Sequence, residues 1–244
     1  EINLSETELL NKLPYALEAM DQPTIDGINT YIISQAASEQ GLKVALSGLG
    51  GDELFAGYDS FKIISGLNKF YHLANTLPIS FREQLGKIIS NIMFTSDTTT
   101  KLVHLINGQM NGAHVYFLIR SLFCAENIST LINDTSIANI EILKNFEKTQ
   151  KIIDSKPNLT LINLTSFLEL TQYTTPTLLR DTDMMSMSHG LEVRVPFLDH
   201  KLVEFAHTIP PKLKLKKFKT KYLLRKAMQH KLPKKILQRK QHGF

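Results

Sequence analysis

Hydrophobic positions recur every three or four residues along most of the chain, which is the pattern of amphipathic helices. The first such run covers residues 6–20, with leucines at 9, 10, 13 and 17. Ser5 and Glu8 form a capping box at its start, and the turn formers Asp21-Gln22-Pro23 follow its end. A second helical pattern runs to about Gln40, where Gly41 is the expected C′ residue.

Residues 42–46 interrupt the helical pattern. Val44, Ala45 and Leu46 are consecutive apolar residues, and a glycine-rich turn follows at once. This combination predicts a short buried β-strand.

The pattern becomes helical again over residues 61–145. Val115–Phe123 is typical of a buried helix, and Ser80 begins a further capping box. A polar connection is predicted at 151–158, followed by a helix over 161–174 that ends near Pro176. A Met-rich helix then precedes an extended stretch around residues 192–194, and residues 219–228 predict a basic amphipathic helix.

The turn after the predicted strand has the sequence Ser-Gly-Leu-Gly-Gly-Asp-Glu, residues 47–53. Three glycines in four residues allow positive φ angles and let backbone N–H groups come close to a ligand. Such a loop at the carboxyl end of a strand can hold phosphate oxygens. Asp52 and Glu53 would repel a bare phosphate, so their presence favours a Mg²⁺ ion between them and the phosphate.

These residues alone leave a second interpretation open. The same sequence suits a tight turn from strand to helix in which Asp52 is the helix N-cap. The Gly-x-Gly-x-x-Gly fingerprint of dinucleotide folds is absent, and so is the Gly-Lys-Ser/Thr of a Walker A loop.

Composition places the chain among globular proteins. It has 244 residues, of which 43% are hydrophobic, and no apolar run approaches the ~20 residues of a membrane span. The single cysteine, Cys124, cannot form an internal disulfide, which fits a reducing cytoplasm. The chain begins with neither Met nor a signal-peptide pattern, so we expect it to be part of a longer protein.

Charge is unevenly distributed. The net charge is +5, but residues 212–240 hold 13 of the 28 Lys and Arg residues and no acidic residue. The rest of the chain therefore has 15 basic and 23 acidic residues, a balance of −8. A basic segment of this kind indicates an anionic partner, either a nucleotide, pyrophosphate, a nucleic acid or an acidic protein surface.

Residues 47–58 resemble the Ser-Gly-x-Gly-x-Asp-Glu signature of the synthetase domain in the asparagine synthetase family. Residues 190–199 resemble its second signature, Gly-Leu-Glu-x-Arg-x-Pro-Phe-Leu-Asp, and residues 232–244 resemble its Leu-Pro…Arg-x-Lys-x-Gly-Phe ending. The resemblance extends from about Asp21 to Phe244. Three positions depart from the family pattern: Gln22 replaces a carboxylate, Met184 a cation, and Gln241 the reactive-site lysine.

The resemblance implies an α/β fold that is mostly α-helical, with a Rossmann-like parallel sheet of the adenine-nucleotide α-hydrolase type. Residues 1–244 would be part of a synthetase domain. Within it, residues 42–58 form the nucleotide loop, 60–175 a helical portion that covers the sheet, and 176–244 the second signature with the basic end. The other strands, a Ser-Gly-Gly-x-Asp-Ser pyrophosphate loop and a glutaminase domain would lie upstream, so we expect the chain alone to be inactive.

The family joins ammonia, made from glutamine, to aspartate. Aspartate attacks the α-phosphorus of ATP, pyrophosphate leaves, and ammonia then displaces AMP from the acyl-adenylate. The resemblance implies that Ser47, Gly48, Leu49, Gly50 and Gly51 bind the nucleotide. It further implies that Asp52 holds Mg²⁺ with support from Glu53, and that a buried Glu192–Arg194 pair orients the site. Since the family's lysine falls on Gln241, either Lys240 offsets negative charge from the adjacent position or the protein lacks this cation.

Two rival functions remain open at this stage. A related adenylating enzyme would act on another carboxylate, as β-lactam synthetases or polysaccharide-associated amidotransferases do. A basic nucleic-acid-binding module is the less favoured rival, because few aromatic residues accompany the basic segment. A homodimer is compatible with either enzyme.

Overall fold

The computed structural model describes residues 3–24, 26–74, 78, 80–81, 84, 112–121, 135–217 and 219–239. These residues are mostly helical and include a small parallel sheet, which confirms the predicted α/β class with a high helical content. The chain divides into two compact units. The sheet unit comprises Glu1–Gly57 and Ser166–Phe244, and the helical unit comprises Tyr58–Thr165.

Two helices open the sheet unit, as the sequence predicts. Helix α1 covers Glu6–Glu18 and begins with the expected capping box between Ser5 and Glu8. Helix α2 covers Asp26–Glu39, and Gly41 follows it with a φ of 81°. A positive φ at this position is typical of a C′ glycine.

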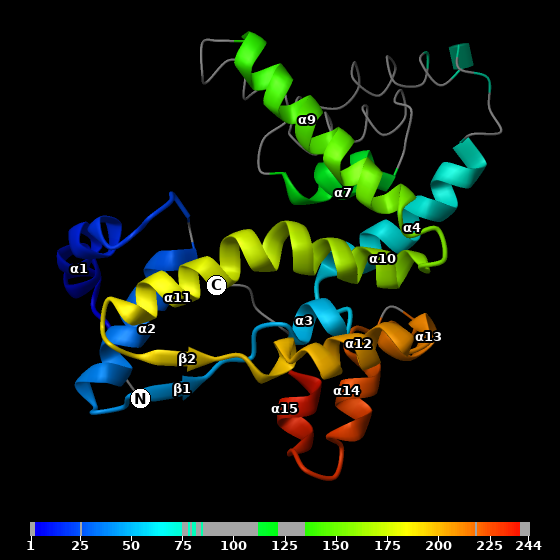
Figure 1. Cartoon of the computed structure of the whole chain (residues 1–244). Coiled ribbons are helices and arrows are strands. Elements are labelled where there is room, and N and C mark those ends of the chain that lie inside the picture. The colour runs from blue at the N-terminus through cyan, green and yellow to red at the C-terminus, as the bar shows by residue number, and fades with distance from the viewer. Residues whose placement is uncertain are drawn as a thin grey trace. The chain divides into compact units, whose positions relative to one another are not determined.

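The sheet consists of two parallel strands, β1 (Val44–Leu46) and β2 (Glu192–Arg194), which lie side by side in Figure 1. Val44 pairs with Glu192 and Leu46 with Arg194, so these four side chains share one face. The prediction of a buried strand is wrong for this face, since the Leu46 side chain is 75% exposed. The cause is that the described residues leave this face of the sheet open.

Helices α10 (Leu161–Leu168), η1 (Glu169–Leu179, a π-helix) and α11 (Arg180–Met187) follow one another without a break (Figure 1). The predicted helix end near Pro176 is therefore wrong. Proline breaks an α-helix because it has no N–H and its ring meets the carbonyl one turn earlier. Here Pro176 lies within π-helical turns, which have a different hydrogen-bond spacing. Helix α11 packs against both α2 and β2.

The rest of the sheet unit is built from short helices. They are α3 (Gly51–Leu54), the 3₁₀ turn η2 (Pro196–Leu198), α12 (His200–Thr208), α13 (Pro211–Lys214), α14 (Tyr222–Ala227) and α15 (Lys234–Gln238). Their core cluster is formed by Leu54, Phe55, Ala206 and Ile209. The basic helix predicted over 219–228 is thus shorter than expected and begins at Tyr222.

The described part of the helical unit contains α4 (Asp59–Ala74), α7 (Gly112–Arg120) and α9 (Thr135–Asp154), and α7 packs against the other two. Because α9 extends to Asp154, the polar connection predicted at 151–158 is shifted to 155–160. Cys124 lies outside the described residues, and so do Arg82 and Glu83 of the capping box predicted at Ser80. Among the described helices, none combines the length and the hydrophobicity that crossing a membrane requires.

Candidate functional site

The candidate site is the loop between β1 and α3. The Ser47 N–H continues the strand pairing by donating to the Arg194 carbonyl at 2.8 Å, and the Ser47 Oγ accepts from the Leu49 N–H at 3.3 Å. Gly50 has a φ of 91° and is the N-cap of α3. The alternative interpretation of Asp52 as the N-cap is therefore wrong, because the cap lies two residues earlier.

The loop packs against the second signature. A Cβ on Gly50 would lie 2.5 Å from Leu198 Cδ2, and one on Gly51 would lie 3.5 Å from the Phe197 ring. No side chain larger than hydrogen fits at Gly50 without displacing Leu198. Residues of the two sequence signatures are therefore in contact in the folded chain, which could not be inferred from either signature alone.

The opposite side of the loop is open at Gly48. A Cβ on Gly48 would meet nothing within 4 Å, and the residue is exposed. Since β1 and β2 are parallel, their carboxyl ends lie at the same edge of the sheet as this open backbone. Ligands of α/β proteins bind outside the carboxyl ends of parallel strands, so the geometry suits a ligand that contacts backbone N–H groups at Gly48.

Asp52 lies at the start of α3 and forms an ion pair with a residue far along the chain. The Lys221 Nζ is 2.9 Å from each of the two carboxylate oxygens. The side chains are largely buried, with 19% of Asp52 and 22% of Lys221 exposed. Gly57 lies against this pair so closely that a Cβ would be 1.9 Å from Asp52 Oδ1.

Glu53 is buried, in contrast to the exposed backbone at Gly48. It is 1% exposed, and its Oε1 accepts a hydrogen bond from the Thr174 Oγ1 at 3.0 Å. The Ser166 hydroxyl donates to the Glu53 backbone carbonyl at 2.6 Å. Glu53 therefore connects the loop to the long helix of residues 161–187. Its backbone carbonyl contacts Ser166 in α10, and its carboxylate contacts Thr174 in the π-helix η1.

These carboxylates do not fit a metal ion held by protein side chains alone. The described part of the chain contains no group of three or more His, Cys, Asp or Glu residues that could hold a metal. Asp52 is neutralised by Lys221, and Glu53 lies in the interior. Asp52 and Glu53 by themselves therefore do not form a complete metal site.

Glu192 and Arg194 form the predicted pair, with 2.8 Å between the Arg194 Nε and the Glu192 Oε1. Its predicted burial is wrong, because the Glu192 and Arg194 side chains are 55% and 61% exposed. Both lie on the open face of the sheet. The hydrogen bond from Arg194 lowers the pKa of Glu192 and raises that of Arg194.

A second polar cluster joins the Asp21-Gln22-Pro23 turn to the long helix. Arg180 donates to Asp21 Oδ2 at 2.5 Å and to Gln22 Oε1 at 2.8 Å. Gln22 also donates to the Pro176 carbonyl at 2.9 Å, and Thr24 donates to Asp181 at 2.6 Å. The Gln22 amide is thus both donor and acceptor, which the carboxylate usual at this position could not be.

Asp181, at the centre of this cluster, is 2% exposed. Burial raises its pKa because the charged form loses hydration, and the nearby Asp26 and Asp21 charges add to the rise. Hydrogen bonds from Thr24 and Gln22 act in the opposite direction. A carboxylate at residue 22 would add a further negative charge here.

The sequence did not single out Lys221, Thr174 or Asp181. Lys221 is one of many cations in the basic segment, and a threonine or aspartate on a helical pattern carries no distinguishing signal. Met184, where family members carry a cation, is partly exposed on α11. Lys240 and Gln241 lie outside the described residues.

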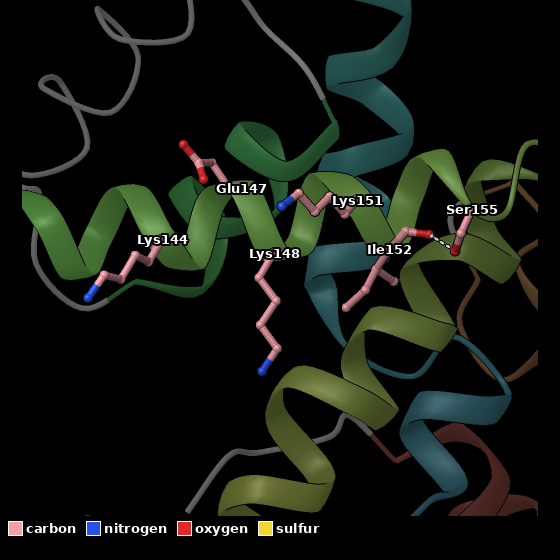
Figure 2. Close-up of a pocket in the computed structure, with 6 residues that line it drawn as sticks. All are labelled: Lys144, Glu147, Lys148, Lys151, Ile152 and Ser155. Carbon is pink, nitrogen blue, oxygen red and sulfur yellow. Dashed lines mark hydrogen bonds between the residues drawn. The ribbon is translucent and has the colours of Figure 1, made fainter.

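The described residues also form surface hollows away from this loop. One lies along α9 and is lined by Lys144, Glu147, Lys148, Lys151, Ile152 and Ser155 (Figure 2). The other is lined by residues of α1 and α2, where Lys12 donates to Gln35 at 2.6 Å. Neither of these two hollows is lined by a predicted site residue.

Parallel strands that end in an open glycine loop are typical of α/β proteins, whose ligands bind at the carboxyl edge of the sheet. The chain belongs to the asparagine synthase family, whose model matches residues 1–244. This establishes the family that the signatures predicted.

Several curated proteins are similar to the chain. Asparagine synthetase [glutamine-hydrolyzing] 1 of Bacillus subtilis is 29% identical and matches 99% of this chain and 37% of its own length. A putative asparagine synthetase of Mycobacterium tuberculosis is 25% identical, with 99% and 35% covered. The amidase chyE of Penicillium rubens is 27% identical, with 85% and 32% covered. The chain thus spans about a third of the length of these relatives, and no solved structure matches it significantly.

Proposed function

We propose that the protein containing this chain forms an amide by ATP-dependent activation of a carboxylate, with aspartate as the acceptor of ammonia derived from glutamine. Family membership supports this class of reaction. The observation that carries the proposal is the open backbone at Gly48, at the carboxyl edge of two parallel strands and supported from behind by the second signature.

The proposed chemistry begins with a carboxylate that is a poor electrophile. Transfer of AMP to it creates a good leaving group, which ammonia then displaces. A site for this reaction must position the phosphates and stabilise their charge. In the proposal, the Ser47 hydroxyl and the Gly48 N–H contact the nucleotide, while Leu49, Gly50 and Gly51 hold the loop in shape.

Other predicted roles stay predictions. Lys240 is proposed to offset developing negative charge, and the exposed Glu192–Arg194 pair to orient a ligand at the sheet edge. Glu53 is proposed to act indirectly, because its buried carboxylate accepts a hydrogen bond from Thr174 and so fixes the position of the loop. Any Mg²⁺ that accompanies ATP would have to compete with Lys221 for Asp52.

The proposal is tested by exchange of labelled pyrophosphate into ATP in the presence of aspartate. We expect the intact protein to catalyse this exchange and residues 1–244 alone to be inactive. The proposal would be contradicted if the intact protein showed no pyrophosphate exchange, or if it exchanged pyrophosphate equally well without aspartate. Robust exchange by residues 1–244 would contradict the expected dependence on upstream sequence.

A second candidate is the same adenylation on another carboxylate. The similarity to amidases such as chyE and the departures at Gln22 and Met184 favour keeping it. The two are distinguished by comparing pyrophosphate release by the intact protein with aspartate and with other carboxylic acids. If another carboxylic acid gave a higher kcat/KM than aspartate, that acid would be the proposed substrate instead.

A further inference from the structure

We infer that Lys221 is a positioning residue of the glycine loop, and that its ammonium group, rather than a metal ion, lies between the two carboxylate oxygens of Asp52. The inference rests on the proposed function only in treating this loop as the phosphate site. The ion pair itself can be tested without ATP.

The geometry of the ion pair supports this role. The Lys221 Nζ lies 2.9 Å from both oxygens of the Asp52 carboxylate, so it occupies the position between them that a cation would take. Both side chains are about four-fifths buried. In such surroundings an unpaired carboxylate is costly, whereas a paired one is tolerated.

The backbone around the ion pair also fits closely to it. Lys221 has a φ of 51°, which is unusual for a residue with a side chain, and its N–H donates to the Phe55 carbonyl at 3.1 Å. The Gly57 N–H donates to the Asp52 carbonyl at 2.7 Å. A Cβ on Gly57 would lie 1.9 Å from Asp52 Oδ1 and 2.5 Å from Lys221 Cε.

The pair changes the electrostatics of the loop. An unpaired Asp52 carboxylate would repel the phosphates of a nucleotide. The Lys221 ammonium offsets this charge. The same residue, the N-cap of α14, also donates its N–H to Phe55, the C-cap of α3, and so connects the two helices. The residue therefore acts through Asp52 and the loop backbone.

The test uses the intact protein without nucleotide, and compares Lys221→Met, Asp52→Asn and the double variant with the wild type. Thermal unfolding and hydrogen–deuterium exchange of residues 48–57 are measured with and without millimolar MgCl₂. Lys219→Met is the matched control, because this exposed lysine lies in the same segment.

We expect Lys221→Met to lower the melting temperature by about 3–8 °C and to speed exchange at Gly57, while Lys219→Met changes neither. The double variant should lose less than the sum of the single losses, since each single substitution already removes the same ion pair. MgCl₂ should not alter loop exchange in the wild type.

Three results would overturn the inference: an unchanged Lys221→Met variant, additive losses in the double variant, or protection of the wild-type loop by MgCl₂. None of these measurements depends on catalysis. Failure of pyrophosphate exchange would therefore count against the proposed function and leave this result standing, and the converse also holds.

Discussion

At the scale of single residues, Lys214 at the end of α13 makes a pH-dependent contribution to stability. It is fully buried, and its ammonium has no hydrogen-bond partner within the described residues. Burial lowers its pKa from 10.5 to about 8. Between these two pH values the unfolded state binds more protons than the folded state, so the free energy of unfolding rises with pH across this window.

Lys214→Met should therefore stabilise the protein at pH 7, by up to ~3 kcal/mol, because a buried charge is replaced by an apolar side chain of similar length. The gain should shrink as the pH approaches 10.5. Urea unfolding at several pH values measures both effects. Lys148→Met is the matched control on the exposed face of α9 (Figure 2), and an equal effect of both variants would contradict the prediction.

Two glycines of the loop should respond differently to the same substitution. Gly50→Ala forces a side chain into a left-handed conformation and against Leu198, so we expect a loss of about 1–3 kcal/mol in the free energy of unfolding. Gly48→Ala meets no neighbour and should change stability by less than about 0.5 kcal/mol, yet weaken nucleotide binding. Urea unfolding and nucleotide titration of both variants check this, and unaltered nucleotide affinity in Gly48→Ala would argue against the proposed contact.

At the scale of elements, Thr174 of the π-helix η1 donates a hydrogen bond to the buried Glu53 carboxylate. Thr174→Val keeps the side-chain shape but removes the hydroxyl that donates to Glu53, so we expect a loss of about 1–3 kcal/mol. Thr174→Ser retains the donor and should lose less. Chemical denaturation measures the difference, and equal losses would show that packing rather than the hydrogen bond matters at this position.

The turn that precedes α2 depends on an amide at Gln22. Gln22→Glu removes the donor to the Pro176 carbonyl and adds a charge near Asp181, whose pKa is already raised by burial. The Arg180 guanidinium, which already donates to residue 22, attracts the new carboxylate and offsets part of this repulsion. We expect the lost donor and the repulsion by Asp181 to outweigh it, giving a loss of ~1–2 kcal/mol at pH 7 that diminishes on acidification as the new carboxylate becomes protonated. A loss independent of pH, measured by denaturation between pH 4 and 7, would exclude the electrostatic part of this explanation.

At the scale of the whole molecule, charge is segregated. Residues 212–240 are basic, and the rest of the chain has a balance of −8. We expect an oligonucleotide of mixed sequence to bind the intact protein only at low salt and without sequence preference, through released counterions. Gel shifts over a salt series measure this. Sequence-specific binding at physiological salt would favour the nucleic-acid-binding rival instead.

Much of the local structure follows from nearby residues. The capping box of Ser5 and Glu8, the C′ glycine at Gly41 and the strand–loop–helix at residues 44–54 depend on interactions within a few positions, so their pattern was sufficient. The helix through Pro176 and the exposed face of β1 were predicted wrongly. The first depends on the π-helical geometry around Pro176, and the second on which distant parts of the chain cover the sheet. Neither can be inferred from the residues nearby in the sequence.

The sequence by itself determined the helical content, the glycine loop and the family signatures, because backbone preferences and side-chain types encode these locally. Only the tertiary structure decided what the acidic residues of the loop contact. Asp52 pairs with Lys221 across 169 positions and Glu53 with Thr174 across 121. The choice among many equivalent lysines and threonines is made by where the folded backbone places them.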